Sequence, residues 1–366
     1  MQPRDVVLED SKSLADSGTE ITNLDVNDPI TELHVQLEAT NGATYNKASP
    51  LERVITKIEV VDGSEVLFSL PGELALAAHA SLVGKVPYGY RTEAGSDTPI
   101  QDIIIPFGRY MYDPAYALNP AGHRNLQLKT TWNLSAVNAV GATGFSTGSL
   151  DYSVMARVMQ NVPAPIAMLT TKDVFDFTSL GSGDQRIEMP DDNPWRALFV
   201  RAYESGVAWD ASLTNFKLQA QGGRYIPFDL PVREFILQQK SSLPPLALGG
   251  DVRASDSVAS ETFIAESMVG AITQYDSRYV FGTAWWWKSN VYMYVHDYDH
   301  TAATNADCWV LDHGWGLHNT FVYPFGILSD PSTWLEAPAL KPLRLYLTQG
   351  NAGAACNVAV QQVRPY

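Results

Sequence analysis

The densest group of potential metal ligands lies at residues 296–300, where the chain reads His-Asp-Tyr-Asp-His. On an extended strand His296 and His300 point to one face, and Asp297 and Asp299 point to the other. Imidazole and carboxylate groups in such sets bind divalent metals in β-sandwich enzymes. Further potential ligands follow at Asp307, His313 and His318. The spacing meets no recognised zinc pattern, so we favour a strand end whose histidines are hydrogen-bonded to polar neighbours. We treat His296, Asp297, Asp299 and His300 as weak metal candidates.

A second cluster is aromatic and lies just before the first. It comprises Trp285, Trp286, Trp287, Tyr292 and Tyr294. Aromatic faces stack on sugars, which would make a carbohydrate platform, but Trp and Tyr are also enriched where protein subunits meet. We favour subunit contact or core packing for these residues.

The segment Gly144-Phe145-Ser146-Thr147-Gly148 fits the G-x-S-x-G pattern of hydrolases. That nucleophile turn needs a strand before it and a helix after it. Here the pattern lies in a loop rich in Gly, Ser, Thr and Ala at 138–149, and a strand follows. We therefore expect no catalytic residues and no cofactor.

Charge and composition narrow the function classes. The chain has 366 residues, 25 Lys and Arg against 40 Asp and Glu, and a net charge of −15. Such an acidic protein is a poor candidate for coating nucleic acid through phosphate contacts, and we expect no direct sequence-specific nucleic acid binding. Charged residues make up only 18%, below the usual ~25%, which suggests that neighbouring subunits cover part of the surface. Two cysteines, Cys308 and Cys356, form no disulfide framework, and we expect free thiols.

The elements around these groups follow a repeated pattern. Ile105-Pro106-Phe107-Gly108, Asp113-Pro114 and Leu126-Gln127-Leu128 recur as Tyr323-Pro324-Phe325-Gly326, Asp330-Pro331 and Leu343-Arg344-Leu345. A copy spacing this long is the size of a domain, whereas solenoid repeats are much shorter. The pattern therefore predicts one fold built twice in tandem.

The repeat extends upstream, where Ile58 and Leu70-Pro71 correspond to Phe216 and Leu230-Pro231. The offset is 158 to 160 residues here and 217 to 218 residues downstream, so the second copy carries an insertion between 232 and 322. In both copies a proline that follows a strand starts a short helix. Downstream, the alternating strand at 151–159 finds its partner around Cys356, Val358 and Val360.

Many short strands with frequent turns and one helix per copy indicate an all-β protein. We predict two tandem eight-stranded antiparallel jelly rolls, each with a short helix. The predicted domains are an acidic N-terminal arm at 1–30, a first roll at 31–165, a linker at 166–186 and a second roll at 187–366. The second roll carries the insertion at about 241–322, with a loop at 241–262 and strands at 277–287 and 289–296.

Two jelly rolls in tandem, a helix after the same strand in each, and the paired Pro-Phe-Gly and Asp-Pro elements resemble a known family. The family is the double jelly-roll major capsid proteins of the adenovirus-related lineage, which includes tailless icosahedral viruses of bacteria and archaea. The resemblance covers residues 30–366. It implies a structural protein of the virion, assembled in the host cytoplasm, whose homotrimers have a nearly hexagonal outline and tile an icosahedral shell.

The resemblance also implies that the insertion forms an outward tower. It further implies contacts with neighbouring capsomers, with penton and minor capsid proteins, with an internal membrane beneath the shell and with a host-surface receptor. Two alternatives remain open from the residues themselves. One is an enzyme on a double β-sandwich, either a glycan amidase-like or a cupin-like metalloenzyme, and the other is a carbohydrate-binding spike protein.

Overall fold

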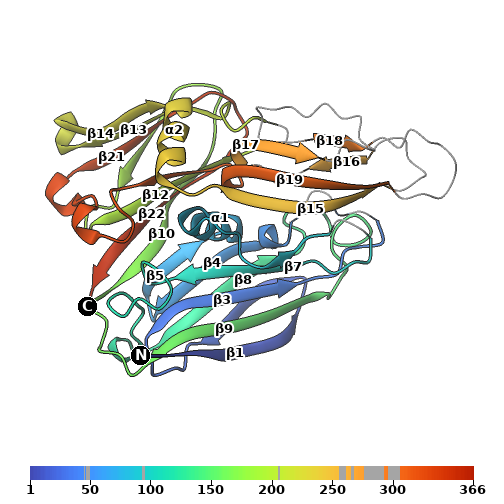
Figure 1. Ribbon diagram of the computed structural model, residues 1–366, viewed down its shortest axis with the longest axis horizontal. Helices are drawn as coiled ribbons and strands as arrows, with labels where there is room; N and C mark the ends of the chain where they lie inside the picture. The colour runs from blue at the N-terminus through green and yellow to red at the C-terminus, as the bar shows by residue number, and fades with distance from the viewer. Residues whose placement is uncertain are drawn as a thin grey trace.

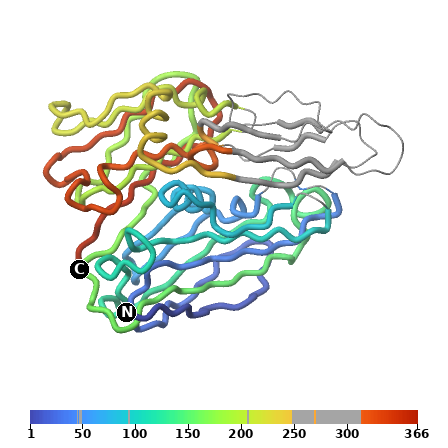
Figure 2. Tube along the Cα trace, in the orientation of Figure 1, coloured from blue at the N-terminus to red at the C-terminus, as the bar shows by residue number. Residues whose placement is uncertain are grey.

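The computed structural model describes residues 1–44, 46, 50–92, 95–204, 207–254, 261–264, 268–275, 292–295 and 306–366. Within these ranges, residues 248–254, 261–264, 270–275, 292–295 and 306–312 are described for the backbone alone. Two stacked β-sandwiches and a projecting group of strands make up the molecule (Figure 1). The two chain ends lie near each other (Figure 2).

The first roll consists of two facing sheets. One has the strand order β1-β9-β3-β7-β6, and its strands are Gln2–Leu14, Leu150–Gln160, Ile30–Glu38, Ile100–Pro106 and Gly89–Tyr90. The other has the order β2-β8-β4-β5, with strands Ser17–Asn23, Leu126–Asn133, Ile55–Asp62 and Glu65–Leu70. Helix α1 (Gly72–Val83) follows β5 and packs against β4 and β7.

The second roll repeats this order, without a counterpart of the two-residue strand β6. Its sheets run β10-β22-β12-β20, with strands Ala167–Thr178, Ala355–Pro365, Trp195–Tyr203 and Thr320–Pro324, and β11-β21-β13-β14, with strands Asp184–Met189, Leu343–Gln349, Leu213–Ala220 and Tyr225–Pro231. Helix α2 (Val232–Ser242) follows β14 as α1 follows β5. The predicted pair of eight-stranded jelly rolls, each with a short helix, is confirmed.

The duplicated sequence elements occupy the same places in both rolls. Ile58 pairs with Leu70 between β4 and β5, and Phe216 pairs with Leu230 between β13 and β14. After the end of β7 the N–H of Phe107 donates to the carbonyl oxygen of Thr31 at 2.9 Å. After the end of β20 the N–H of Phe325 donates to the carbonyl oxygen of Arg196 at the same distance.

The paired Asp-Pro elements are turn caps. Oδ1 of Asp113 accepts from the N–H of Ala115 at 3.0 Å, and Oδ1 of Asp330 accepts from the N–H of Ser332 at 3.0 Å. Asp side chains stabilise turns by this local bond to the backbone. The repeated motifs therefore encode chain turns.

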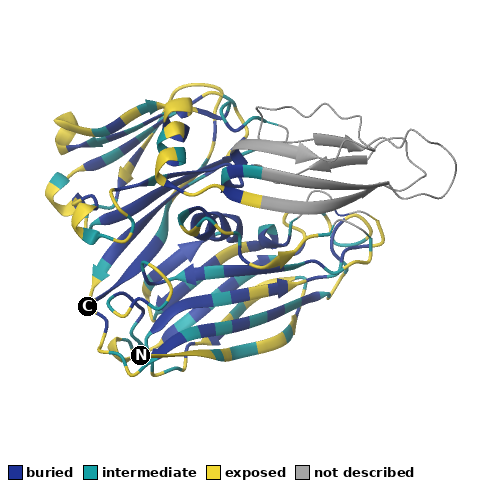
Figure 3. Ribbon diagram, viewed as in Figure 1, coloured by how far each residue is buried: buried dark blue, intermediate teal, exposed yellow. Residues whose placement is uncertain are grey.

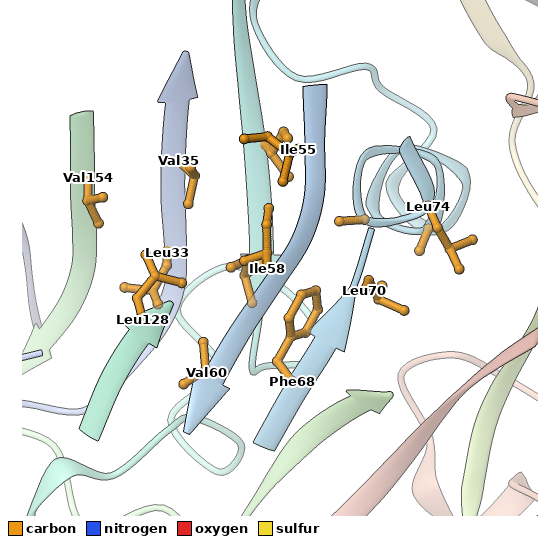
Figure 4. Packing of buried hydrophobic residues seen from close by; sticks show 14 of the residues in the cluster. Leu33, Val35, Ile55, Ile58, Val60, Phe68, Leu70, Leu74, Leu128 and Val154 are labelled. Atoms are coloured by element: carbon orange, nitrogen blue, oxygen red, sulfur yellow. The ribbon is translucent and has the colours of Figure 1, made fainter. Parts of the chain in front are cut away.

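Each roll has an apolar core between its sheets (Figure 3). Alternate residues of each strand point inward, as the two-residue period of a strand requires. Figure 4 shows this packing in the first roll, where residues from six elements meet: Leu33, Val35, Ile55, Ile58, Val60, Phe68, Leu70, Leu74, Leu128 and Val154. In the second roll Phe216, Phe235 and Phe321 pack against one another, with centroids 4.5 to 6.2 Å apart.

The expected N-terminal arm at 1–30 is wrong, because β1 and β2 lie in the two sheets of the first roll. β1 pairs with β9 from Gln2 opposite Gln160 to Leu14 opposite Leu150. Its inner face is short and broken by two register shifts, so the alternation that marks a strand is weak in the sequence. The acidic residues lie mainly on the exposed face of this edge strand.

The expected linker at 166–186 is also wrong. Residues 167–178 form β10 and residues 184–189 form β11, so the second roll begins about twenty residues earlier than the predicted Ile187. The Pro and Gly residues that flank this segment end strands rather than mark a passage between domains. The division of the chain between the rolls therefore falls close to Pro165.

The insertion contributes a three-stranded and a two-stranded sheet, which we call the tower. Its strands are β15 (Leu246–Ala254), β16 (Glu261–Ile264), β17 (Met268–Tyr275), β18 (Tyr292–Val295) and β19 (Ala306–Leu317). β15 corrects the loop expected at 241–262. The strand expected at 277–287 lies outside the described residues, and β18 falls within the strand expected at 289–296.

Candidate functional site

The two rolls are joined by a continuous sheet. β5 of the first roll pairs in parallel with β10 of the second, with Phe68 opposite Thr171 and Ser69 opposite Lys172. This pairing merges one sheet of each roll into an eight-stranded sheet. Ala197, Phe199 and Ala359, on the outer face of the second roll, belong to the same buried cluster as the core of the first roll. The relative position of the two rolls is therefore fixed by both hydrogen bonds and apolar burial.

Helix α1 lies at the centre of this junction, between the rolls and the base of the tower. Its residues from Gly72 to Ser81 are all buried. Leu76, Ala77 and Ala80 pack against Leu246, Met268 and Leu317 at the ends of tower strands. The tower of the second roll thus rests on the helix of the first roll (Figure 1).

A buried ionic group, which we call the junction cluster, bridges the two rolls. Its members are Glu52, Arg53, Glu73 and Arg91 from the first roll and Arg201 and His318 from the second. Arg91 donates to Glu52 at 2.8 Å, and Arg53 donates to Glu73 at 2.5 Å. Arg201 also donates to Glu73 across the roll boundary. His318 lies between the two carboxylates, 3.0 Å from Glu52 and 3.5 Å from Glu73.

Electrostatics hold the carboxylate of Glu73 in its charged form. Burial acts to raise its pKa, but the charges of Arg201, His318 and Arg53 outweigh burial and lower the pKa to about 2. A buried ion pair of this kind adds little net stability over apolar packing, but removing one partner leaves the other charge buried and uncompensated. The junction cluster therefore selects one docking geometry of the two rolls.

The two repeated turns also meet at this junction. Arg196 donates from Nη2 to the carbonyl oxygen of Arg109 and from Nε to that of Leu328, both at 2.9 Å. Arg109 donates to the carbonyl oxygen of Ser329 at 3.2 Å. Burial, together with the nearby charge of Arg109, lowers the pKa of Arg196 to about 10. One buried guanidinium thus ties the turn of the first roll to that of the second.

An open cavity of about 410 Å³ lies beside the β5–β10 pairing and is lined by residues of both rolls, among them Lys57, Ser69, Asp173, Asp176 and Asn357. Burial and the adjacent carboxylate of Asp176 raise the pKa of Asp173 to about 8. Within the described residues, three or more His, Cys, Asp or Glu side chains nowhere come together as a metal site. The cavity thus places a pair of neighbouring carboxyl groups, Asp173 and Asp176, beside the junction.

Asp173→Asn is expected to stabilise the protein, most clearly at alkaline pH. The pKa of Asp173 is raised on folding, so the folded state loses stability as pH rises from about 4 through about 8, where the native carboxyl ionises. Asn cannot ionise, so the gain in the free energy of unfolding should be clearly larger at pH 8 than at pH 5. Urea unfolding at pH 5 and pH 8 measures it. The exposed Asp25→Asn is the control, and an equal effect of both variants at pH 8 would contradict the assignment.

The outer face of sheet β1-β9-β3-β7 is polar and acidic. His34 on β3 lies 2.8 Å from Asp102 and 3.1 Å from Glu32. Burial acts to lower the pKa of His34, but the hydrogen bonds to both carboxylates raise it to about 9. Gln36 and Glu38, further along β3, are exposed. This face differs from the matching face of the second roll, which is covered by α1 and the first roll.

The residues singled out in the sequence fall mainly outside the described residues. The metal candidates His296, Asp297, Asp299 and His300 do so, as do Trp285, Trp286 and Trp287. Tyr292 and Tyr294 lie on β18, which pairs with β16. His318 lies in the junction cluster, far along the chain from the carboxylates it contacts. The hydroxyl of Ser146 donates to the carbonyl oxygen of Asn41 at 3.1 Å, as a loop-stabilising contact.

Sequence reasoning missed the junction cluster. In the sequence, Glu73 is an acidic residue in the first turn of a helix, where the helix dipole favours it, and Arg201 is a single basic residue within an apolar strand. The available signal is the repeat itself. The second residue of α1 is acidic and the second residue of α2, Arg233, is basic, so equivalent positions face different surroundings.

No protein-family model and no curated protein matches this chain. Among solved structures, the major capsid protein of Sulfolobus turreted icosahedral virus is 10% identical, with a TM-score of 0.60 over 100% of this chain and 98% of that one. The capsid protein of PBCV-1 virus is 11% identical, with a TM-score of 0.60 over 99% and 93%. The major capsid protein P2 of bacteriophage PM2 is 12% identical, with a TM-score of 0.53 over 100% and 98%. The chain has the double jelly-roll fold of these viral capsid proteins.

Proposed function

We propose that this protein is the major capsid protein of an icosahedral virus and that it acts without catalysis. The observation that carries the proposal is the junction. Two similar rolls stand side by side in one continuous sheet, and a buried ionic cluster spans them. An arrangement that fixes two copies of one fold in one orientation suits a building block better than a catalyst. The match to capsid proteins over nearly the whole of both chains supports the same function.

The proposed block is a homotrimer. Three chains with two rolls each present six similar units around a threefold axis, so the outline approaches a hexagon, which can tile a shell facet. Neighbouring capsomers, penton proteins and minor capsid proteins are the proposed partners, and the virion, assembled in the host cytoplasm, is the proposed location. An internal membrane and a host receptor are further proposed contacts, the latter through the tower.

The described residues include no helix long and apolar enough to cross a bilayer. The double-sandwich enzyme and the carbohydrate-binding spike gain no support from the described residues, so we do not propose them.

The assembly state tests the proposal directly. Native mass spectrometry of the purified chain at micromolar concentration is expected to show trimers, and electron microscopy is expected to show blocks with a nearly hexagonal outline. Stable interfaces of this kind bury well over ~1,200 Å², so the trimer should persist through gel filtration. A monomer at micromolar concentration and a stoichiometric transition metal in the purified protein would together refute the capsid function.

A further inference from the structure

Helix α1 carries a buried histidine, His79, that the junction cluster does not include. The residue is 8% exposed, and its Nδ1 has no hydrogen-bond partner within the described residues. It follows Ala78, which packs on the core cluster of the first roll, and precedes Ala80, which packs against the base of the tower. His79 is therefore held where the first roll, its helix and the tower meet. Burial favours the neutral imidazole, because the charged form loses more hydration.

Two carboxylates act on this histidine, but both are already paired with cations. Glu32 on β3 accepts from Arg157 at 2.6 Å and lies 3.1 Å from His34. Asp102 on β7 lies 2.8 Å from His34, and its buried Oδ1 accepts no hydrogen bond from any described residue. Burial acts to lower the pKa of His34, but the hydrogen bonds to both carboxylates raise it to about 9. The two negative charges are thus balanced by His34 and Arg157, and a second charged imidazole would have no counter-charge of its own.

A buried cation of the second roll also acts on His79. Arg196 on β12 is 4% exposed. Its recorded hydrogen bonds all go to neutral acceptors, which are two backbone carbonyl oxygens of the paired turns and Oε1 of Gln361. Protonation of His79 would therefore add a second buried positive charge in the field of this guanidinium, and like charges disfavour the charged form of each group.

The other ionisable groups on elements that pack against α1 provide no counter-charge for His79. On η1 (Leu51–Val54), β4, β19 and β20 the described side chains of this kind are Glu52, Arg53, Lys57, Glu59, Asp62, His313 and Tyr323. The three carboxylates among them already have partners, because Glu52 pairs with Arg91, Glu59 with Lys57 and Asp62 with His123.

The pKa of His79 follows from these surroundings. Burial lowers it to about 4, while the charges of Glu32 and Asp102 offset only part of the effect and those of His34 and Arg196 reinforce it. The pKa is thus lowered on folding from an ordinary value of 6.5, so the unfolded chain takes up the proton more readily. The stability that depends on the neutral imidazole is complete above about pH 6.5 and is lost as pH falls toward 4.

We propose that His79 is an acid-sensitive lock, whose protonation releases α1 from the first roll and so loosens the base of the tower. A charged imidazole cannot stay buried without a counter-charge or water, so the helix has to move to hydrate it. Leu76, Ala77 and Ala80 of the same helix pack against three tower strands, and a displaced helix withdraws that support. The lock goes beyond the capsid function and does not depend on it, because it is tested on the purified protein in any assembly state.

Urea unfolding of the unchanged chain and of His79→Gln tests the lock. Gln does not ionise, so between pH 7 and pH 4 the folding equilibrium constant of the unchanged chain should fall by about 100-fold more than that of the variant. His123→Gln is the matched control, because the side chain of His123 is 4% exposed but lies 3.0 Å from Asp62, which balances its charge. This control should keep the full acid loss. Parallel pH profiles for His79→Gln and the unchanged chain would refute the lock.

Nuclear magnetic resonance of the unchanged protein with isotope-labelled histidine follows the same group without a variant. One imidazole, that of His79, should stay neutral at pH 5, whereas that of His34 should stay charged at pH 8. If every histidine signal instead titrates near pH 6.5, the inference is wrong, whether or not the variants fold.

Amide hydrogen exchange, corrected for the pH dependence of the intrinsic rates, locates the release. As pH falls from 7 to 5, peptides that cover 72–83 should lose protection before those that cover β8 and β13, which contribute to the cores of the two rolls. In His79→Gln the helix should keep its protection at pH 5. A simultaneous loss of protection in all peptides would show global acid unfolding and would overturn the inference, with the capsid function left standing.

Discussion

Deletion of residues 2–14 is expected to abolish the cooperative folding of the first roll. These residues form β1, which pairs with β9 along its whole length. Leu14 is buried, and Val6 and Leu8 pack on the core. Loss of several backbone hydrogen bonds, at about 1 kcal/mol each, together with three apolar side chains, at about 1 to 2 kcal/mol each, should cost well over 5 kcal/mol. That is a large part of the stability of a typical domain.

Thermal unfolding followed by circular dichroism, with a gel-filtration profile, measures this effect. The control is Asp10→Asn on the exposed side of the same strand, which should leave the unfolding midpoint unchanged. A truncated chain that unfolds at the same midpoint as the full chain would show that the segment is a dispensable arm.

Glu73→Gln is expected to destabilise the protein by about 3 kcal/mol, because it leaves Arg201 and Arg53 buried without their shared counter-charge. Gln keeps the size of the side chain, so the loss reports on charge rather than on packing. Urea unfolding at pH 7 measures the effect. Glu188→Gln removes a carboxylate of a fully exposed ion-pair group, and its midpoint should not change.

The pH dependence of the same variant carries a second signature. The pKa of Glu73 is lowered on folding from an ordinary value near 4.5 to about 2. Its contribution to stability is therefore complete above about pH 4.5 and is lost as pH falls toward 2. The unchanged chain should lose stability steeply over this range and the variant less so. Parallel acid-unfolding curves for the two proteins would show that Glu73 is not ionised in the junction.

The fold was predictable because the duplication left local signals in the sequence. Pro106 and Pro324 mark strand ends, and Asp113 and Asp330 cap turns, so the same short-range rules act twice at a fixed spacing. β12 (Trp195–Tyr203) is buried on both faces, so its nearly continuous apolar run is a clear strand signal. Edge strands gave weaker signals. β1 has few inward side chains. β10 is buried up to Thr171 and more exposed from Lys172 onward, and its pairing shifts register between Asp173 and Phe175. Neither strand therefore shows a clean two-residue alternation.

The junction was not predictable, because its contacts join residues far apart in the chain. Glu52 and His318 are 266 positions apart, and neither the spacing nor the composition around them indicates the other. The local density of aromatic and potential ligand side chains instead favours residues 285–300. Comparing the two copies position by position, as with Glu73 and Arg233, is the step that would have indicated a surface with a different neighbour.

The base of the tower has a practical consequence. The insertion leaves the second roll after α2 and returns at β20, and its first and last strands run side by side, with Leu246 opposite Gly314. A foreign segment inserted between β15 and β19 would have its two ends held together by the pairing of these strands. Because the entropy of closing a loop grows only slowly with its length, the scaffold should accept foreign peptides of very different sizes at this point, which makes it a natural position for multivalent display of an epitope.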